Sequence, residues 1–140
     1  MSLPPSARAL VEKGTLGHLV TLNPDGSPQV SCVWVGLEGD DLVVGSIGPR
    51  QKLRNVERDP RVAISFEAEG EDRLRLRHYL VVHGTASVES GGAPALLQRL
   101  AGAYIGPGVR FPPMDRPPEG FVMRIRVTRV GGNGPWLDEE

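Results

Sequence analysis

Apolar and polar residues alternate along much of this chain with the period of two that is typical of β-strands. In the segment 121–132, for example, apolar residues alternate with Arg124, Arg126 and Thr128. Clusters rich in Gly, Pro, Asn and Asp, such as "NPDGS" at 23–27, separate the alternating segments and mark turns. The pattern predicts six strands, at 17–22, 28–38, 42–47, 61–68, 78–90 and 121–132.

Three other segments have the spacing of helices, with apolar residues three or four positions apart. The middle one, "RQKLRNVERD", follows Pro49 and is stopped by Pro60, and Leu53 and Val56 form its inward-facing pair. A long loop rich in proline and glycine, 106–120, precedes the last strand. The predicted helices span 4–13, 49–59 and 93–105.

The chain of 140 residues has no internal repeat and is long enough to bury the core of a single domain, which we place at 1–140. Six strands joined mostly by hairpins would leave open edges unless the sheet closed on itself. We therefore expect a mainly β fold, a six-stranded antiparallel barrel with flanking helices.

Composition narrows the function classes. The 39% of hydrophobic and 24% of charged residues are ordinary for a soluble protein, and the net charge of −1 argues against a general nucleic-acid binder. The single cysteine, Cys32, excludes an internal disulfide, and we expect it to be a small buried residue. We find no signal peptide and no apolar stretch that would cross a membrane, so a cytoplasmic location is expected.

Positive charge is concentrated directly after the third predicted strand. Residues 50–61 contain five basic and two acidic side chains, a net charge of +3. Backbone N–H groups at a helix N-terminus favour a bound phosphate. Ser46 adds a hydroxyl and Gly48 permits close approach of the backbone. Arg50 and Lys52 add charge. The residues therefore predict a phosphate-binding cradle, and the competing interpretation is an ordinary solvated helix face.

The stretch from Asp25 to Ser65 resembles the flavin-binding split-barrel superfamily to which pyridoxamine-phosphate oxidases belong. The motifs that carry the resemblance are "DGSPQ" at 25–29, Ser46 at a strand end, "RQKLRN" at 50–55 and "RDPR" at 58–61. Within the superfamily, the pattern is similar to the branch of small proteins that use the deazaflavin coenzyme F420. The resemblance implies an antiparallel split barrel that holds its cofactor across a homodimer interface.

The resemblance also implies which residues bind the cofactor. Arg50 and Lys52 would hold its phosphate. Ser46 and Ile47 would lie beneath the ring or its linker. Gly48 and Asn55, in the same stretch, are also expected to bind the cofactor. Those that would border the ring are Ser31, Cys32 and Val33. Tyr79 and Trp136 would come from the second subunit to cover the ring.

Two features have a second interpretation. Trp136 follows a flexible "GGNG" run, so it either docks on a partner subunit or a ring, or packs against its own barrel. The loop 106–118 is either a lid over a substrate site or a stiff surface excursion. The three histidines lack metal-ligand spacing, so we expect no metal site.

The resemblance implies redox chemistry, in which reduced F420 transfers a hydride to a small unsaturated or quinone-like molecule. Two alternatives stay open. One is an FMN-dependent oxidase or reductase on the same fold, since both cofactors present a phosphate. The other is a binding protein that carries a flavin or a tetrapyrrole without turnover. We find no acid–base constellation, and a cofactor-dependent hydride transfer needs none.

Overall fold

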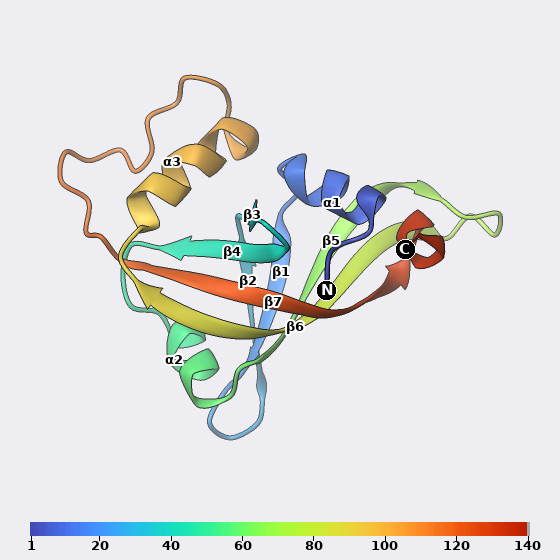
Figure 1. Ribbon diagram of the computed structural model, residues 1–140, viewed down its shortest axis with the longest axis horizontal. Helices are drawn as coiled ribbons and strands as arrows, with labels where there is room; N and C mark the ends of the chain where they lie inside the picture. The colour runs from blue at the N-terminus through green and yellow to red at the C-terminus, as the bar shows by residue number, and fades with distance from the viewer. Residues whose placement is uncertain (140) are drawn as a thin grey trace.

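The computed structural model describes residues 1–139 as one curled β-sheet with helices on its outside (Figure 1). The helices are α1 (Pro5–Glu12), α2 (Gln51–Arg58) and α3 (Ala93–Tyr104), with a 3₁₀ turn η1 (Pro135–Asp138) near the end. The strands are β1 (Gly17–Leu22), β2 (Pro28–Val33), β3 (Gly36–Glu38), β4 (Asp41–Ser46), β5 (Arg61–Glu71), β6 (Arg77–Ser90) and β7 (Phe121–Asn133).

All seven strands belong to one antiparallel sheet in the order β2-β1-β5-β6-β7-β4-β3. Its two ends, β2 and β3, are not hydrogen-bonded to each other, which makes the barrel a split one. The inner faces supply a core whose fully buried members include Leu19, Ile64, Phe66, Leu80, Val82, Met123 and Ile125. The predicted split-barrel fold is confirmed, with one strand more than expected.

The additional strand arises because the predicted strand 28–38 breaks after Val33. The backbone N–H of Val35 donates to Tyr104 Oη at 2.9 Å, and Tyr104 Oη donates to the carbonyl of Thr15 at 2.7 Å. A side chain at Gly36 would press on Leu100, since a Cβ there would lie 2.9 Å from Leu100 Cδ2. The chain therefore turns a corner beneath α3 and passes from one end of the sheet to the other.

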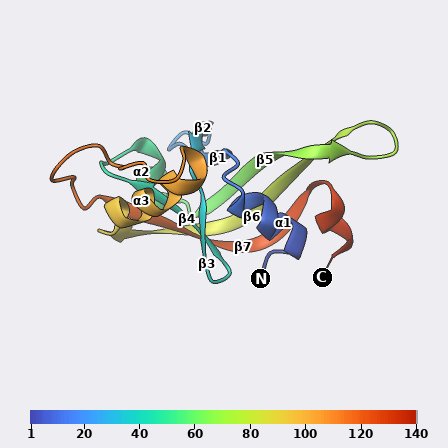
Figure 2. The same ribbon diagram turned by 90° about the horizontal axis from the view of Figure 1, so that it is seen from above.

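Strand β5 is longer than predicted, and the hairpin that joins it to β6 projects from the body of the molecule (Figures 1 and 2). The side chain of Asp72 caps the turn by accepting hydrogen bonds from the N–H groups of Leu74 and Leu76, at 2.8 and 3.0 Å. Further along β6, the pairing with β7 shifts register at Gly84, where a Cβ would collide with the carbonyl of Arg126.

Helix α2 buries Leu53 and Val56 as predicted, and it also buries Asn55 completely. Asn55 Nδ2 donates to Thr21 Oγ1 and to Asn23 Oδ1, both at 3.0 Å, and Asn55 Oδ1 accepts from Gln51 Nε2 at 2.8 Å. The N–H and C=O groups of a buried amide each need a hydrogen-bond partner. The network that provides these partners fixes α2 against the end of β1.

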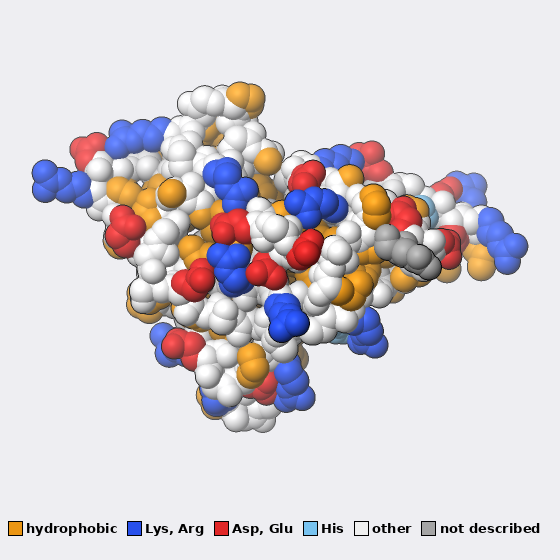
Figure 3. All heavy atoms as spheres, viewed as in Figure 1, with side chains coloured by type: hydrophobic (Ala, Val, Ile, Leu, Met, Phe, Trp, Pro, Cys, Tyr) orange, Lys and Arg blue, Asp and Glu red, His pale blue; other side chains and the backbone are white. Residues whose placement is uncertain are grey.

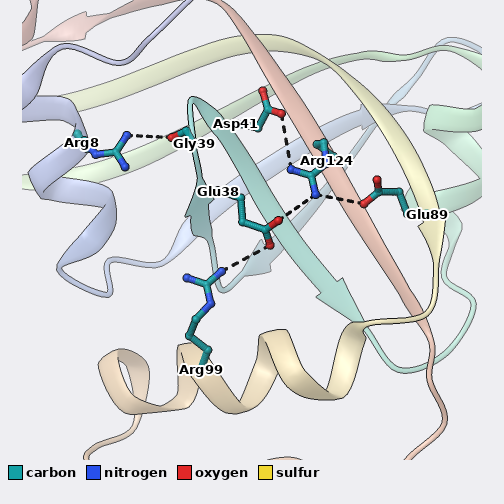
Figure 4. Close-up of polar contacts among 7 residues, drawn as sticks. All are labelled: Arg8, Glu38, Gly39, Asp41, Glu89, Arg99 and Arg124. Atoms are coloured by element: carbon teal, nitrogen blue, oxygen red, sulfur yellow. Dashed lines mark hydrogen bonds and ion pairs between the residues drawn. The ribbon is translucent and has the colours of Figure 1, made fainter.

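A cluster of charged residues joins four strands on the face seen in Figures 3 and 4. The guanidinium of Arg124 on β7 lies 2.9 Å from Glu38, 3.3 Å from Glu89 and 3.6 Å from Asp41. Hydrogen bonds to Glu38 and then Glu89 raise the pKa of Arg124 above its ordinary value. Arg99 on α3 adds a longer contact to Glu38, 3.7 Å.

Across residues 1–139, no helix combines the length and apolar character needed for a membrane span.

Candidate functional site

A cavity of about 250 Å³ lies at the split of the barrel, where β2 and the end of β4 come together beside α2. Residues of β2 and β4, and of the segments that directly follow these two strands, line it, with one residue each from α2, α3 and loop 106–120. The lining residues are Cys32, Val33, Trp34, Gly45, Ile47, Lys52, Leu97 and Phe111. Four of the predicted cofactor-binding residues, Cys32, Val33, Ile47 and Lys52, therefore meet here.

Lys52 supplies the positive charge of this cavity. Its side chain is half-buried, and burial lowers the pKa of Lys52 below its ordinary value, with a smaller contribution from the neighbouring Arg50. Within residues 1–139, Lys52 forms no ion pair. A buried ammonium without a counter-charge is unfavourable, so an anionic ligand in the cavity would be stabilised by it.

Helix α2 begins at Gln51, two positions later than predicted, so Arg50 is its N-cap residue, and the side chain of Arg50 is exposed. The guanidinium donates to the carbonyl of Pro49 at 3.0 Å and lies beside Gly48, where a Cβ would come within 3.2 Å of Nη1. Arg50 therefore stands near Lys52 without lining the cavity itself.

Two of the predicted cofactor-binding residues next to the cavity have hydrogen-bond partners within the chain. Ser46 Oγ donates its proton to the carbonyl of Gly48 at 2.6 Å, so the hydroxyl expected to bind a phosphate instead holds the turn before α2. Asn55, expected among the cofactor-binding residues, is fully buried and engaged with Thr21, Asn23 and Gln51. Its amide faces the barrel because it lies next to Val56 on the inner side of α2.

Cys32 is exposed, not buried as expected. Alternation along β2 places it on the outward face with Val30, whereas Gln29, Ser31 and Val33 point inward. Ser31 Oγ is the one buried side-chain polar atom without a hydrogen-bond partner among residues 1–139. Of the three β2 residues predicted to border the ring, Cys32 and Val33 line the cavity and Ser31 does not.

Tyr79 and Trp136 do not line the cavity. Tyr79 is next to Leu80 on β6, and Leu80, Phe66, Gly17 and Val33 pair in succession across four strands. At about 4.8 Å per strand, Leu80 lies roughly 15 Å across the sheet from the cavity wall at Val33.

Of the two interpretations of Trp136, packing against its own barrel is the observed one. The indole is 4% exposed, and Nε1 donates to the carbonyl of Gly131 at 3.0 Å. The indole surface is therefore covered by its own chain, and a contact of Trp136 with a partner's ring stays a prediction.

Sequence reasoning missed Trp34 and Phe111, two aromatic residues of the cavity. Their ring centroids are 4.9 Å apart with planes at 52°, and Trp34 also stacks on Tyr104 at 5.3 Å and 12°. Trp34 stands two positions after Cys32, so the alternation of side chains along a strand indicates that both point to the same side. The sequence therefore contained a signal that Trp34 lies near the predicted site. Phe111 comes from a loop without periodicity, which carried no such signal.

A row of mostly apolar residues crosses the outer face of the barrel on β2, β1, β5 and β6. Val30, Val20, Ala63 and His83 pair in succession across four strands and share the outward face. Val30 is 60% exposed, and three of these residues line a shallow hollow of about 210 Å³.

Comparison with known proteins agrees with this architecture. Residues 3–133 match the family described as pyridoxamine 5'-phosphate oxidase. A solved structure named F420 reductase is 29% identical, with a TM-score of 0.69, over 89% of this chain and 94% of the other. A heme-binding protein from Mycobacterium smegmatis is 25% identical, with a TM-score of 0.65, over 91% of this chain and 52% of the other. HupZ from Group A Streptococcus shares the fold at 22% identity and a TM-score of 0.62, over 91% of this chain and 90% of the other.

Proposed function

Since the chain belongs to the pyridoxamine 5'-phosphate oxidase family, we propose that it is an oxidoreductase that transfers a hydride from reduced F420 to a small unsaturated or quinone-like acceptor. The observation that carries the proposal is Lys52, a half-buried ammonium without an ion pair in the described chain, in the cavity at the barrel split. The 29% identity to a protein named F420 reductase favours the deazaflavin over other cofactors.

In this proposal, Lys52 binds the cofactor phosphate from within the cavity, and Arg50 binds it from the rim. Both contacts are charge-assisted, and the planar guanidinium of Arg50 can grip two oxygens. Cys32 and Val33 on one wall and Ile47 on the other would fix the plane of the ring. The bound cofactor would supply the hydride, and these residues would hold it in orientation and exclude water.

We further propose that the protein works as a homodimer. Tyr79 is 47% exposed and does not line the cavity of its own chain, so its ring is free to contact a cofactor bound to a second chain. The outward row of Val30, Val20 and Ala63 provides an apolar surface for such a contact. Exposed apolar surface of this kind marks interaction sites in soluble proteins.

FMN remains the second candidate cofactor. The family description favours it, and the same two cations would receive its phosphate. Transport or storage of a tetrapyrrole is the third candidate, and the similarity to a heme-binding protein from Mycobacterium smegmatis supports it.

The proposal is tested by titrating the purified protein with F420, FMN and hemin, and by following the oxidation of reduced F420 with menadione as acceptor. We expect F420 to bind more tightly than FMN or hemin, and reduced F420 to be consumed only when protein and menadione are both present. Tighter binding of FMN or hemin would contradict the choice of cofactor. Binding of F420 without turnover would contradict the assignment as an enzyme.

A further inference from the structure

Trp34 has two aromatic neighbours, and they are held in different ways. Tyr104 is fixed by its position on α3 and by its hydroxyl, which donates to Thr15 and accepts from the N–H of Val35. Phe111 belongs to the loop between α3 and β7, which has no regular structure of its own. One neighbour is therefore part of the scaffold, and the other depends on the position of a loop.

The side chain of Gln98, which is exposed on α3, attaches this loop. Gln98 Nε2 donates to the carbonyl of Val109 at 2.7 Å, and Gln98 Oε1 accepts from the N–H of Phe111 at 2.9 Å. Among residues 1–139, these are the hydrogen bonds that join 107–118 to the remainder of the chain. Hydrogen bonds to an exposed side chain are worth little individually, so this attachment is reversible.

The cavity is small while Phe111 is in place. Its volume of about 250 Å³ is below the range of about 300–1,000 Å³ that is usual for sites of drug-sized ligands. A cofactor ring and a flat acceptor must both fit during hydride transfer. Among the residues that line the cavity, Phe111 is the one that comes from the loop, and its ring packs against Trp34. Displacement of Phe111 would therefore free space next to Trp34.

We propose that Trp34 is the acceptor-binding subsite, that Phe111 occupies it in the absence of ligand, and that Gln98 is the latch of a lid formed by 106–118. The ligand class is a flat conjugated molecule, such as a quinone, which replaces the Phe111 ring against Trp34. Phe111 and Gln98 then determine how readily an acceptor enters. This inference depends on the proposed function only for the chemical class of the acceptor.

The lid is tested first without any ligand, by acrylamide quenching of tryptophan fluorescence. Trp34 and Trp136 are the two tryptophans of the chain, and Trp136 is 4% exposed. We expect Phe111→Ala and Gln98→Ala to increase quenching about twofold, since each exposes Trp34. Met114→Ala, in the same loop, is the matched control, and Trp34→Phe should abolish the difference. Equal quenching in all variants would overturn the lid.

The subsite is tested by titrating the protein alone with menadione and following Trp34 emission. Removing the latch raises the fraction of open protein, so Gln98→Ala and Phe111→Ala should bind menadione about three- to tenfold more tightly than the unmodified chain. Unchanged or weaker binding would overturn the proposal that Phe111 competes with the acceptor. Neither measurement contains F420, so failure of the cofactor assignment leaves this result interpretable, and failure here leaves the cofactor titration unaffected.

Discussion

At the scale of single residues, neighbours on α2 have separate tasks. Lys52 faces the cavity, whereas Asn55, three positions later, is directed into the barrel and holds α2 on β1. The sequence run that contains both resembles a cofactor-binding motif, and this led us to assign both to the cofactor. The contacts divide the run into one residue that faces the cavity and one that fixes the helix.

Asn55→Ala should destabilise the protein by about 2–4 kcal/mol, because it removes four hydrogen bonds and leaves Thr21 in the interior with one partner fewer. The free energy of unfolding in urea measures the effect. Arg54→Ala, at an exposed position of the same helix, is the control and should change stability by less than about 0.5 kcal/mol. Equal effects of the two variants would contradict a structural role for Asn55.

Residue-level prediction from sequence worked where one strand or helix decides the outcome. Ile47 directly follows the end of β4, Lys52 lies in the first turn of the helix that comes next, and both line the cavity. Sequence did not predict the surroundings of Trp136 and Asn55, because the surfaces that bury them come from segments distant in sequence. Nothing local indicates that the indole of Trp136 returns to its own barrel.

At the scale of elements, alternation and turn residues predicted six of the seven strands in the correct order along the chain. The division of the segment 28–38 was not predictable, since Tyr104 on α3 takes the N–H of Val35 away from the sheet. The lining of the cavity was only partly predictable for the same reason. Leu97 and Phe111 arrive from α3 and the following loop.

The strand pairs around β7 also depend on charge. Arg124→Met should lower the free energy of unfolding by about 1–2 kcal/mol, because Glu38, Asp41 and Glu89 then repel one another without a central cation. The loss should be smaller in 1 M salt, because the Debye length is then about 3 Å and repulsion between carboxylates farther apart than this is largely screened. Urea denaturation at low and high salt measures both effects.

Arg99→Met is the matched control for this prediction. Arg99 is half-exposed and contacts only Glu38 within this cluster, at 3.7 Å, so its removal should cost less than about 0.5 kcal/mol. A loss for Arg124→Met that is no larger than the control would show that the cluster adds nothing to the pairing of these strands.

At the scale of the whole molecule, Tyr79 lies at the end of the β6–β7 pair that is far from the β4 wall of the cavity, and it does not line the cavity. A second chain placed against the outward face of β1, β2 and β5 would bury Val30 and its row. In the proposed dimer, the barrel of one chain would provide part of the cofactor site and the second chain would provide the remainder.

Val30→Glu should convert the proposed dimer to a monomer, since it places a charge in the centre of the apolar row. Sedimentation equilibrium measures the mass. Ile105→Glu, an equally exposed apolar position after α3, should leave the dimer intact. A monomeric unmodified chain at micromolar concentration, or a dimer that survives Val30→Glu, would contradict this interface.

The most direct test of the central claim is the affinity for F420 of the Arg50→Ala/Lys52→Ala variant, measured by fluorescence titration. The account predicts a loss of about 2–4 kcal/mol in binding free energy, because two charge-assisted contacts to the phosphate are removed. An Arg8→Ala/Arg54→Ala variant, which loses the same charge outside the cavity, should bind as the unmodified protein does. Equal affinities of the two double variants would contradict the claim that an anionic cofactor group binds where β4 leads into α2.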